Sequence, residues 1–260
     1  MSGIGMGHQS EEERQAFEQE AFRLVEQANL QGLTLRLLGS LAFYLHCPRY
    51  GHLQRKLGRR YTDIDLAGYS REAARIPRFF AELGYREEAE VNVLFAGQRM
   101  IFHHPGRPLH VDVFFDRLDF CHVIPWEGRL EVDSPTIPLA EMLLEKLQIV
   151  QINEKDIVDT CMLLLEHPLA DHDNDAIHVG RVARLCAQDW GLWRTVTFNL
   201  EKVVQMVQTY EQLSSEERAR VVEQVQTLRE RLDREPKDLR WRLRDRVGTR
   251  VKWYRDVDDL

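Results

Sequence analysis

Two parts of the chain differ in hydrophobic pattern, and this difference constrains the fold more than any other feature. Before Pro138, short segments rich in β-branched and aromatic residues alternate with amphipathic segments of helical period. From Pro138 onward the pattern is helical almost throughout, with breaks near 167–175, Gly191 and Pro236. Strands and helices followed by helices alone predict an α+β fold, in which a mixed β-sheet with flanking helices precedes a helical C-terminal domain. We place the boundary after residue 168.

Local signals indicate where the elements of the first part lie. Ser10 and Glu13 have the spacing of a capping box, which predicts a helix over 10–31. Strands are expected in LTLRLL, YTDIDLAGY and PLHVDVFFD, a hairpin in EVNVLFAGQRMIFHH with its turn near Ala96, a short strand in RLEVDS, and a helix over 71–83. The intervening segment RYGHLQRKLGRR is basic and carries turn residues.

Composition excludes several classes of protein. The chain has no run of eighteen or more apolar residues, so we expect no transmembrane helix and no membrane partner. Its N-terminus lacks a basic region followed by an apolar core, so we expect no signal peptide. No pair of cysteines has the CxxC spacing, which argues against both a zinc knuckle and a disulfide framework. The four cysteines are therefore interpreted as small buried residues of a cytoplasmic protein.

The C-terminal region is strongly basic although the whole chain has a net charge of −7. Eight lysine or arginine residues lie between Lys237 and Arg255, against two aspartates. We interpret this region as a solvated helix face from which Trp241 and Trp253 pack inward. The alternative is a nucleic-acid contact through phosphate neutralisation and aromatic stacking.

Three aspartates on predicted strands form a candidate metal site. Asp63 and Asp65 are one residue apart, so a strand places both on one face, roughly 6–7 Å apart along the backbone. Asp112 lies on a later strand between two valines. Such carboxylates are hard oxygen ligands for Mg²⁺, and two ions can polarise both oxygens of a phosphoryl displacement. The junction at Gly39 and Ser40 would present backbone N–H groups to a phosphate at a helix N-terminus.

Each of these residues also has a purely structural interpretation. Asp63 and Asp65 would then be solvated acids at an exposed strand end, and Asp112 an acid on an edge strand. Ser40 would cap the helix that follows it. Likewise the histidine and aspartate cluster over 167–173 is interpreted as a polar loop rather than a set of metal ligands.

The ordered set of GS after a strand, DID on the next strand and a later VDV resembles the nucleotidyltransferase superfamily, with its DNA polymerase β-like fold. The segment EKLQIVQINEKDIVDTCMLL at 145–164 is similar to a lysine- and aspartate-containing helix of the AbiEii-type toxin nucleotidyltransferases. The resemblance covers about residues 33–165 and implies a catalytic domain over 1–168. It implies that Lys146 contacts the nucleotide phosphates. The following helix would supply Lys155, Asp156 and Asp159 to the nucleotide site.

The resemblance implies a Mg²⁺-dependent enzyme that moves a nucleoside monophosphate from a nucleoside triphosphate to a hydroxyl acceptor and releases pyrophosphate. Asp63, Asp65 and Asp112 would hold two Mg²⁺ ions. Transfer RNA or another RNA, a protein side chain and a small hydroxylated compound all remain open as acceptors. The basic stretch over 46–60, which is longer than the toxin pattern has, and the basic C-terminus favour RNA. Membership of the toxin group would in addition require an antitoxin partner.

Other interpretations remain open for the helix residues and for the function. Lys146 has no carboxylate three or four positions away, which excludes an ion pair along its own helix and suggests a solvated or snorkelling lysine. Asp156 and Asp159 would then simply face solvent. The alternative functions are a catalytically inactive nucleotide- or RNA-binding module of the same fold, and a structural or interaction protein.

Overall fold

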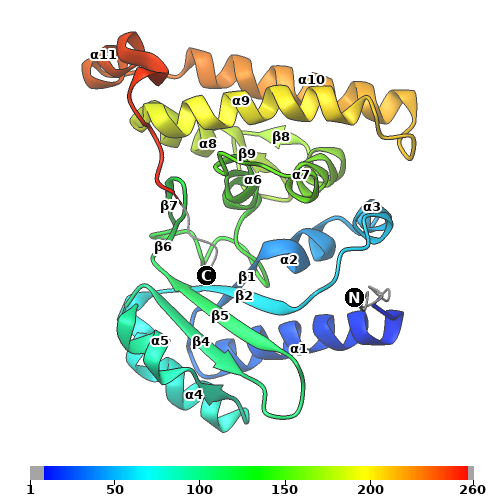
Figure 1. The fold of residues 1–260 in the computed structure, drawn as a ribbon, viewed down its shortest axis with the longest axis vertical. Coiled ribbons are helices and arrows are strands. Elements are labelled where there is room, and N and C mark those ends of the chain that lie inside the picture. Colours follow the sequence, from blue (N-terminus) through cyan, green and yellow to red (C-terminus); the bar gives the residue numbers. More distant parts are fainter. Residues whose placement is uncertain (1–8, 96, 257–260) are drawn as a thin grey trace, which may run out of the picture.

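The computed structural model describes residues 9–95 and 97–256 and shows a mixed α/β fold, as the sequence predicts (Figure 1). The chain forms a five-stranded sheet, which lies in the lower half of this view with helices α1 and α4 beneath it. The upper half of the molecule is helical and holds the long helices α9 and α10. No described helix is long and apolar enough to cross a membrane.

The sheet is mixed and has the strand order β1-β2-β5-β4-β3. Its strands are β1 (Arg36–Leu38), β2 (Asp63–Gly68), β3 (Arg86–Glu87), β4 (Arg99–His103) and β5 (His110–Phe115). The central strands β2 and β5 run parallel, and every other neighbouring pair is antiparallel. One face of the central strands is fully buried by Ile64, Leu66, Val111 and Val113. Because side chains alternate along a strand, the aspartates of these strands face the other side.

Helices and short strands surround this sheet. The helices are α1 (Glu11–Leu30), α2 (Gly39–His46), α3 (Gly51–Lys56), α4 (Ile76–Glu82), α5 (Ala89–Leu94), α6 (Leu139–Leu147), α7 (Glu154–Glu166), α8 (Val179–Gln188), α9 (Trp190–Val207), α10 (Ser215–Arg234) and α11 (Leu239–Val247). The 3₁₀ turns are η1 (Ser70–Arg75) and η2 (Gly248–Arg250), and two small ladders pair β6 (Arg117–Asp119) with β7 (Val123–Pro125) and β8 (Leu169–Ala170) with β9 (Ile177–His178). The capping box of Ser10 and Glu13 is present at α1.

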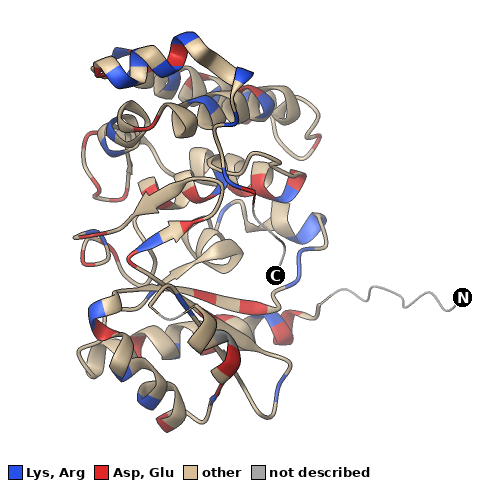
Figure 2. Cartoon of the chain, turned by 60° about the vertical axis from the view of Figure 1, so that its left-hand side comes forward, with Lys and Arg blue, Asp and Glu red and all other residues tan. Residues whose placement is uncertain are grey.

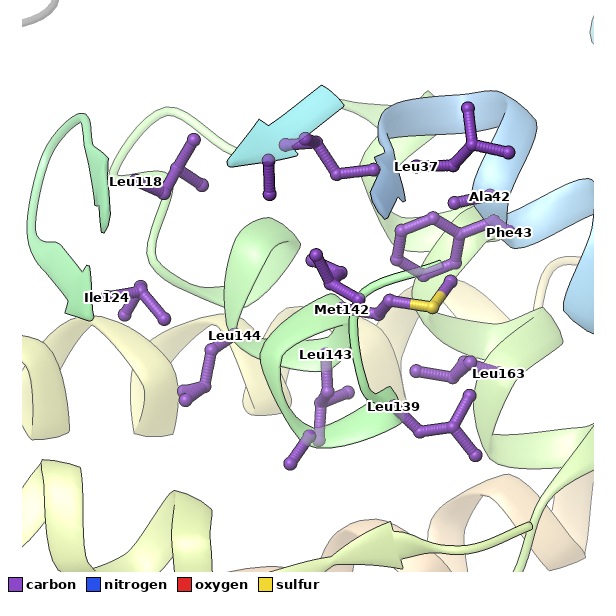
Figure 3. Close-up of a cluster of buried hydrophobic side chains, with 14 of the residues drawn as sticks. Leu37, Ala42, Phe43, Leu118, Ile124, Leu139, Met142, Leu143, Leu144 and Leu163 are labelled. Carbon is purple, nitrogen blue, oxygen red and sulfur yellow. The ribbon is translucent and has the colours of Figure 1, made fainter. Parts of the chain in front are cut away.

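Helix α6 joins the sheet to the helical half of the molecule. All nine of its residues are buried. Leu139, Met142 and Leu143 pack in one hydrophobic cluster with Leu37 of β1 and Phe43 of α2 (Figure 3). The cluster also includes Leu163 of α7 and residues of the β6–β7 hairpin. A helix buried on every side can bring polar side chains to a neighbouring helix only if those side chains find partners there.

Several local predictions are wrong. The predicted hairpin does not form, because its first half is the helix α5, while Ala96 lies outside the described residues. The buried side chain of Asn92 explains the difference: its Oδ1 accepts from Ile101 N–H at 2.7 Å, so a side-chain amide takes the place of a strand partner. The segment RLEVDS forms turns instead of a strand, and the β6–β7 hairpin was not predicted.

Two predicted segments have a different helical structure. The stretch with turn residues contains the helix α3. The helix predicted over 71–83 is divided into η1 and α4, and Pro77 lies in the first turn of α4. Proline has no N–H to give to a preceding carbonyl, so a new helix begins there.

The C-terminal region agrees with its predicted role as a solvated face with inward-packing tryptophans. The indole of Trp241 is buried and donates to the carbonyl of Cys186 at 3.0 Å. The indole of Trp253 is half-buried and donates to Thr195 Oγ1 at 3.1 Å. The arginines of α11 lie mostly in solvent, along the uppermost helix in Figure 2. All four cysteines are free and buried, as expected.

Candidate active site

The register of the sheet brings the three predicted aspartates together. Asp65 on β2 is the direct partner of Asp112 on β5, and Asp63 is the partner of His110. Partners in a parallel ladder point to the same face, so all four side chains lie side by side on the open face of the sheet. Figure 2 shows acidic segments along a central strand at this position. Asp63 and Asp65 are half-buried, whereas Asp112 is buried, and β5 is central rather than an edge strand.

Gly39 lies directly against this acidic face. Its φ is +75°, in the left-handed region that glycine tolerates best. A Cβ at this position would come 2.4 Å from Asp65 Oδ2. The helix α2 therefore begins beside a carboxylate and requires a glycine there. Its N-cap is Leu38, with no side-chain capping bond, so the prediction of Ser40 as an N-cap is wrong.

Negative charge is concentrated around Asp65. Burial and the charges of Asp63, Asp112 and Glu145 raise the pKa of Asp65 well above its usual range, with Lys146 acting in the opposite direction. A carboxyl in this environment resists ionisation unless positive charge arrives. The neighbours of Asp65 therefore leave part of the negative charge on this face of the sheet unbalanced.

Asp112 already has basic neighbours. Arg99 Nε donates to Asp112 Oδ1 at 3.1 Å. His110 Nε2 lies 3.7 Å from Asp112 Oδ2 and 3.9 Å from Asp63 Oδ2. Sequence reasoning did not identify Arg99 or His110 as site residues. The alternation along β4 and β5 would have placed both on the acidic face once the strand register was known.

A second polar cluster is centred on Lys146, which is only 6% exposed. Its ammonium lies 2.8 Å from Glu145 Oε1, 3.6 Å from Asp159 Oδ2 and 3.8 Å from Asp156 Oδ1. Burial lowers the pKa of an ammonium, but these three carboxylates outweigh burial and raise the pKa of Lys146. The interpretation of Lys146 as a solvated lysine is therefore wrong. Asp156 and Asp159 are buried and do not face solvent.

The two clusters meet at Glu145. Its Oε2 accepts the backbone N–H of Gly39 at 3.2 Å, and its Oε1 contacts Lys146. Lys146 also lies over the ring of Phe43 at 5.1 Å from the ring centroid. Glu145 was not among the predicted site residues. It is adjacent to Lys146 in sequence, but only the packing of α6 against α2 shows that it reaches Gly39.

Part of the basic stretch over 46–60 belongs to the Lys146 cluster. Gln54 of α3 donates to Asp159 Oδ1 at 2.7 Å and to the carbonyl of Ser40 at 3.1 Å. Arg59 lies 3.4 Å from Asp159 Oδ2. These contacts fasten the stretch to α7 and to the start of α2. Lys155, in contrast, is exposed on α7 and forms no ion pair within the described residues.

The predicted metal ligands match Mg²⁺ in kind, because they are carboxylates with unbalanced negative charge. Their side chains are not arranged around an ion: among residues 9–95 and 97–256, no three His, Cys, Asp or Glu side chains have the geometry of a metal site. The contact of Asp112 with Arg99 explains part of this, since one of its oxygens is already engaged. Within the predicted polar loop, Asp173 is ion-paired with Arg129.

A cleft of about 1070 Å³ lies beside both clusters. Its walls come from the β4–β5 side of the sheet, the segment before α7 and the C-terminal residues Tyr254–Asp256. Arg99 and Asp156 line it, and these residues contact Asp112 and Lys146 respectively. A smaller depression of about 420 Å³ between α9 and α10 is lined by none of the predicted site residues.

Comparison with protein families and with curated proteins finds no match for this chain.

Proposed function

We propose that this protein is a Mg²⁺-dependent nucleotidyltransferase with its catalytic site at the open face of β2 and β5. The observation that carries the proposal is the register of these strands, which sets Asp63, Asp65 and Asp112 side by side next to Gly39. Acids concentrated at one point destabilise a fold unless a cation or hydrogen-bond donors compensate their charge, and a bound metal ion would do so here. The neighbouring glycine turn, buried lysine and large cleft supply the other parts that nucleotide transfer requires.

In the proposed reaction the triphosphate lies against the backbone at Gly39 and Ser40, at the N-terminus of α2. Glu145 contacts both the N–H of Gly39 and the ammonium of Lys146, so Lys146 lies near the same position. There Lys146 would balance the charge that develops on the leaving pyrophosphate. Asp63 and Asp65 would hold Mg²⁺, which when bound polarises the phosphoryl oxygens. Asp112 would complete this ligand set and orient the acceptor hydroxyl towards the α-phosphorus. The rate gain would come mainly from positioning and charge neutralisation.

We specify the acceptor of this reaction only by its chemical class. A hydroxyl of RNA, of a protein side chain or of a small compound fits the reaction equally well. The basic residues of the 46–60 stretch are in part engaged with α7, since Arg49 contacts Glu166 and Arg59 contacts Asp159. Because these ion pairs occupy the arginines, the basic stretch supports an RNA acceptor less strongly than the sequence alone suggests.

A thermal-shift assay tests the proposal. Wild type and Asp63→Asn are heated with each nucleoside triphosphate, with and without Mg²⁺. Ligand at a hundredfold excess over Kd adds about 2.7 kcal/mol of stability, which is visible as a higher melting temperature. We expect a Mg²⁺-dependent rise in wild type that Asp63→Asn lacks, while its melting temperature without ligand stays close to wild type.

A labelled-nucleotide assay with RNA and protein acceptors then tests transfer itself. An inactive binding module of the same fold would give the thermal shift without transfer. A structural protein would give neither.

A further inference from the structure

The last described residues, 251–256, run from α11 back towards the sheet; we call them the C-terminal strap (Figure 1). Contacts on both sides of Tyr254 fasten this strap. Trp253 donates to Thr195 Oγ1 at 3.1 Å, and its carbonyl lies so close to Gly191 that a Cβ there would approach it to 2.4 Å. Arg255 donates its backbone N–H to the carbonyl of Cys121 at 3.1 Å. Its guanidinium also forms an ion pair with Asp119.

Between these contacts, Tyr254 forms part of one wall of the cleft. Phe95, Phe114 and Phe120 line the same cleft, and all four rings are half-buried. Aromatic rings left partly exposed in a cleft offer flat apolar surface that a planar ligand can cover. The exposed amides of Gln98 and Gln151, together with these rings, provide hydrogen bonds as well as stacking surface.

The charges of the cleft lining argue against a long nucleic-acid strand as the ligand. Arg99, Arg117 and Arg255 are matched by Asp116, Asp119, Asp156 and Asp256. Asp119 pairs with both Arg117 and Arg255, and Arg99 pairs with Asp112. Binding of a long nucleic-acid backbone requires a surplus of basic residues, and this lining has none. Stacking of a single base requires only the rings.

We propose that the cleft binds a nucleobase, and that the ring of Tyr254 on the C-terminal strap stacks on it. The inference rests on the proposed function, because Arg99 and Asp156 connect the cleft to Asp112 and Lys146. The base belongs either to the donor nucleotide or to the end of an RNA acceptor. Both sources present the same planar heterocycle to the cleft.

Nucleosides without phosphate test this inference separately from catalysis. Adenosine, guanosine, cytidine and uridine are titrated into the full chain by calorimetry without Mg²⁺. Four proteins are compared: wild type, Tyr254→Ala, Tyr254→Phe and the control Phe198→Ala, which removes a 43% exposed ring on α9. We expect binding of at least one nucleoside, about tenfold weaker in Tyr254→Ala and unchanged in Tyr254→Phe and Phe198→Ala.

A further variant guards against local misfolding at Tyr254. Arg255→Ala keeps the tyrosine ring but removes the ion pair with Asp119, so it should also weaken nucleoside binding. Repeating the titration with saturating nucleoside triphosphate, or with saturating short single-stranded RNA, identifies the source of the base by which of them blocks the nucleoside. Absence of nucleoside binding, or equal affinity in wild type and Tyr254→Ala, overturns the inference.

The two proposals fail in different ways. Nucleoside binding that depends on Tyr254, without any nucleotide transfer, would sink the proposed function and leave the base site standing. Transfer that depends on Asp63, with nucleoside affinity unchanged by Tyr254→Ala, would sink only the base site.

Discussion

The backbone N–H of Gly39 donates to the carboxylate of Glu145 at 3.2 Å. The other oxygen of that carboxylate lies 2.8 Å from the ammonium of Lys146. In the proposed reaction both the Gly39 turn and Lys146 serve the triphosphate. Without nucleotide, therefore, one side-chain carboxylate holds the two groups that an incoming phosphate would use.

Glu145→Gln should strengthen nucleotide binding. The amide oxygen can still accept from Gly39, but the negative charge that repels a triphosphate is gone. We expect Kd for a nucleoside triphosphate to fall about tenfold at low salt, which corresponds to about 1.4 kcal/mol. Calorimetry without Mg²⁺ measures this, with the exposed Glu90→Gln as control. Weaker binding in Glu145→Gln would show instead that the Glu145 carboxylate takes part in holding the ligand.

Asp65→Asn should stabilise the protein without metal, and more so at higher pH. The pKa of Asp65 is raised in the folded state, so the native state binds its proton more tightly than the unfolded chain. Wild-type stability therefore falls as pH rises from the ordinary value of 3.8 through the raised pKa, and the variant lacks this loss. Urea unfolding at pH 5 and pH 8 compares the two, with the exposed Asp233→Asn as control. An advantage for Asp65→Asn that does not grow with pH would contradict the assignment.

Lys146→Met should destabilise the protein strongly. It leaves Glu145, Asp156 and Asp159 buried without the ammonium that all three contact. Removing one partner of a buried ion pair costs about 3–5 kcal/mol. The exposed Lys155→Met is the matched control, and we expect it to stay within about 0.5 kcal/mol of wild type. Urea denaturation followed by circular dichroism measures both. A loss of under about 1 kcal/mol in Lys146→Met would mean that the cluster tolerates its own repulsion.

Gly39→Ala should abolish Mg²⁺-dependent nucleotide binding. Its Cβ would displace the Asp65 carboxylate, which lies 2.4 Å from that position. Gly84→Ala is a matched control, because Gly84 also has a positive φ, +89°, but no atom lies within 4 Å of its added Cβ. Each substitution costs about 1–2 kcal/mol of backbone strain. Only Gly39→Ala should lose the nucleotide-dependent thermal shift, and equal behaviour of the two variants would remove Gly39 from the site.

Features that depend on neighbouring residues could be predicted from the sequence. A strand has a side-chain period of two, so Asp63 and Asp65 had to share a face once β2 was recognised. The capping box of Ser10 and Glu13 likewise marked the start of α1. The sequence also led correctly to a mixed fold with a helical second half.

The local sequence pattern gave a wrong prediction where a side chain forms a hydrogen bond that a strand backbone would otherwise form. The first strand of the hairpin predicted over 90–104 is the clearest example. Its residues alternate as a strand would, yet Asn92 on α5 bonds to the backbone of Ile101 and makes a strand there unnecessary. Such a substitution depends on how two segments meet in space, and a pattern within one segment does not contain it.

Which residues form the site depends on contacts between elements that are far apart in the chain. The pairing of Asp65 with Asp112 depends on the β2–β5 register, which is set across the many residues that lie between these strands. The contacts of Lys146 with Asp159, and of Gln54 with Asp159, depend on the packing of α6 and α3 against α7. A buried charge has to find its partners wherever the fold brings them. The candidate residues could therefore be recognised in the sequence, whereas the contacts between them depend on packing.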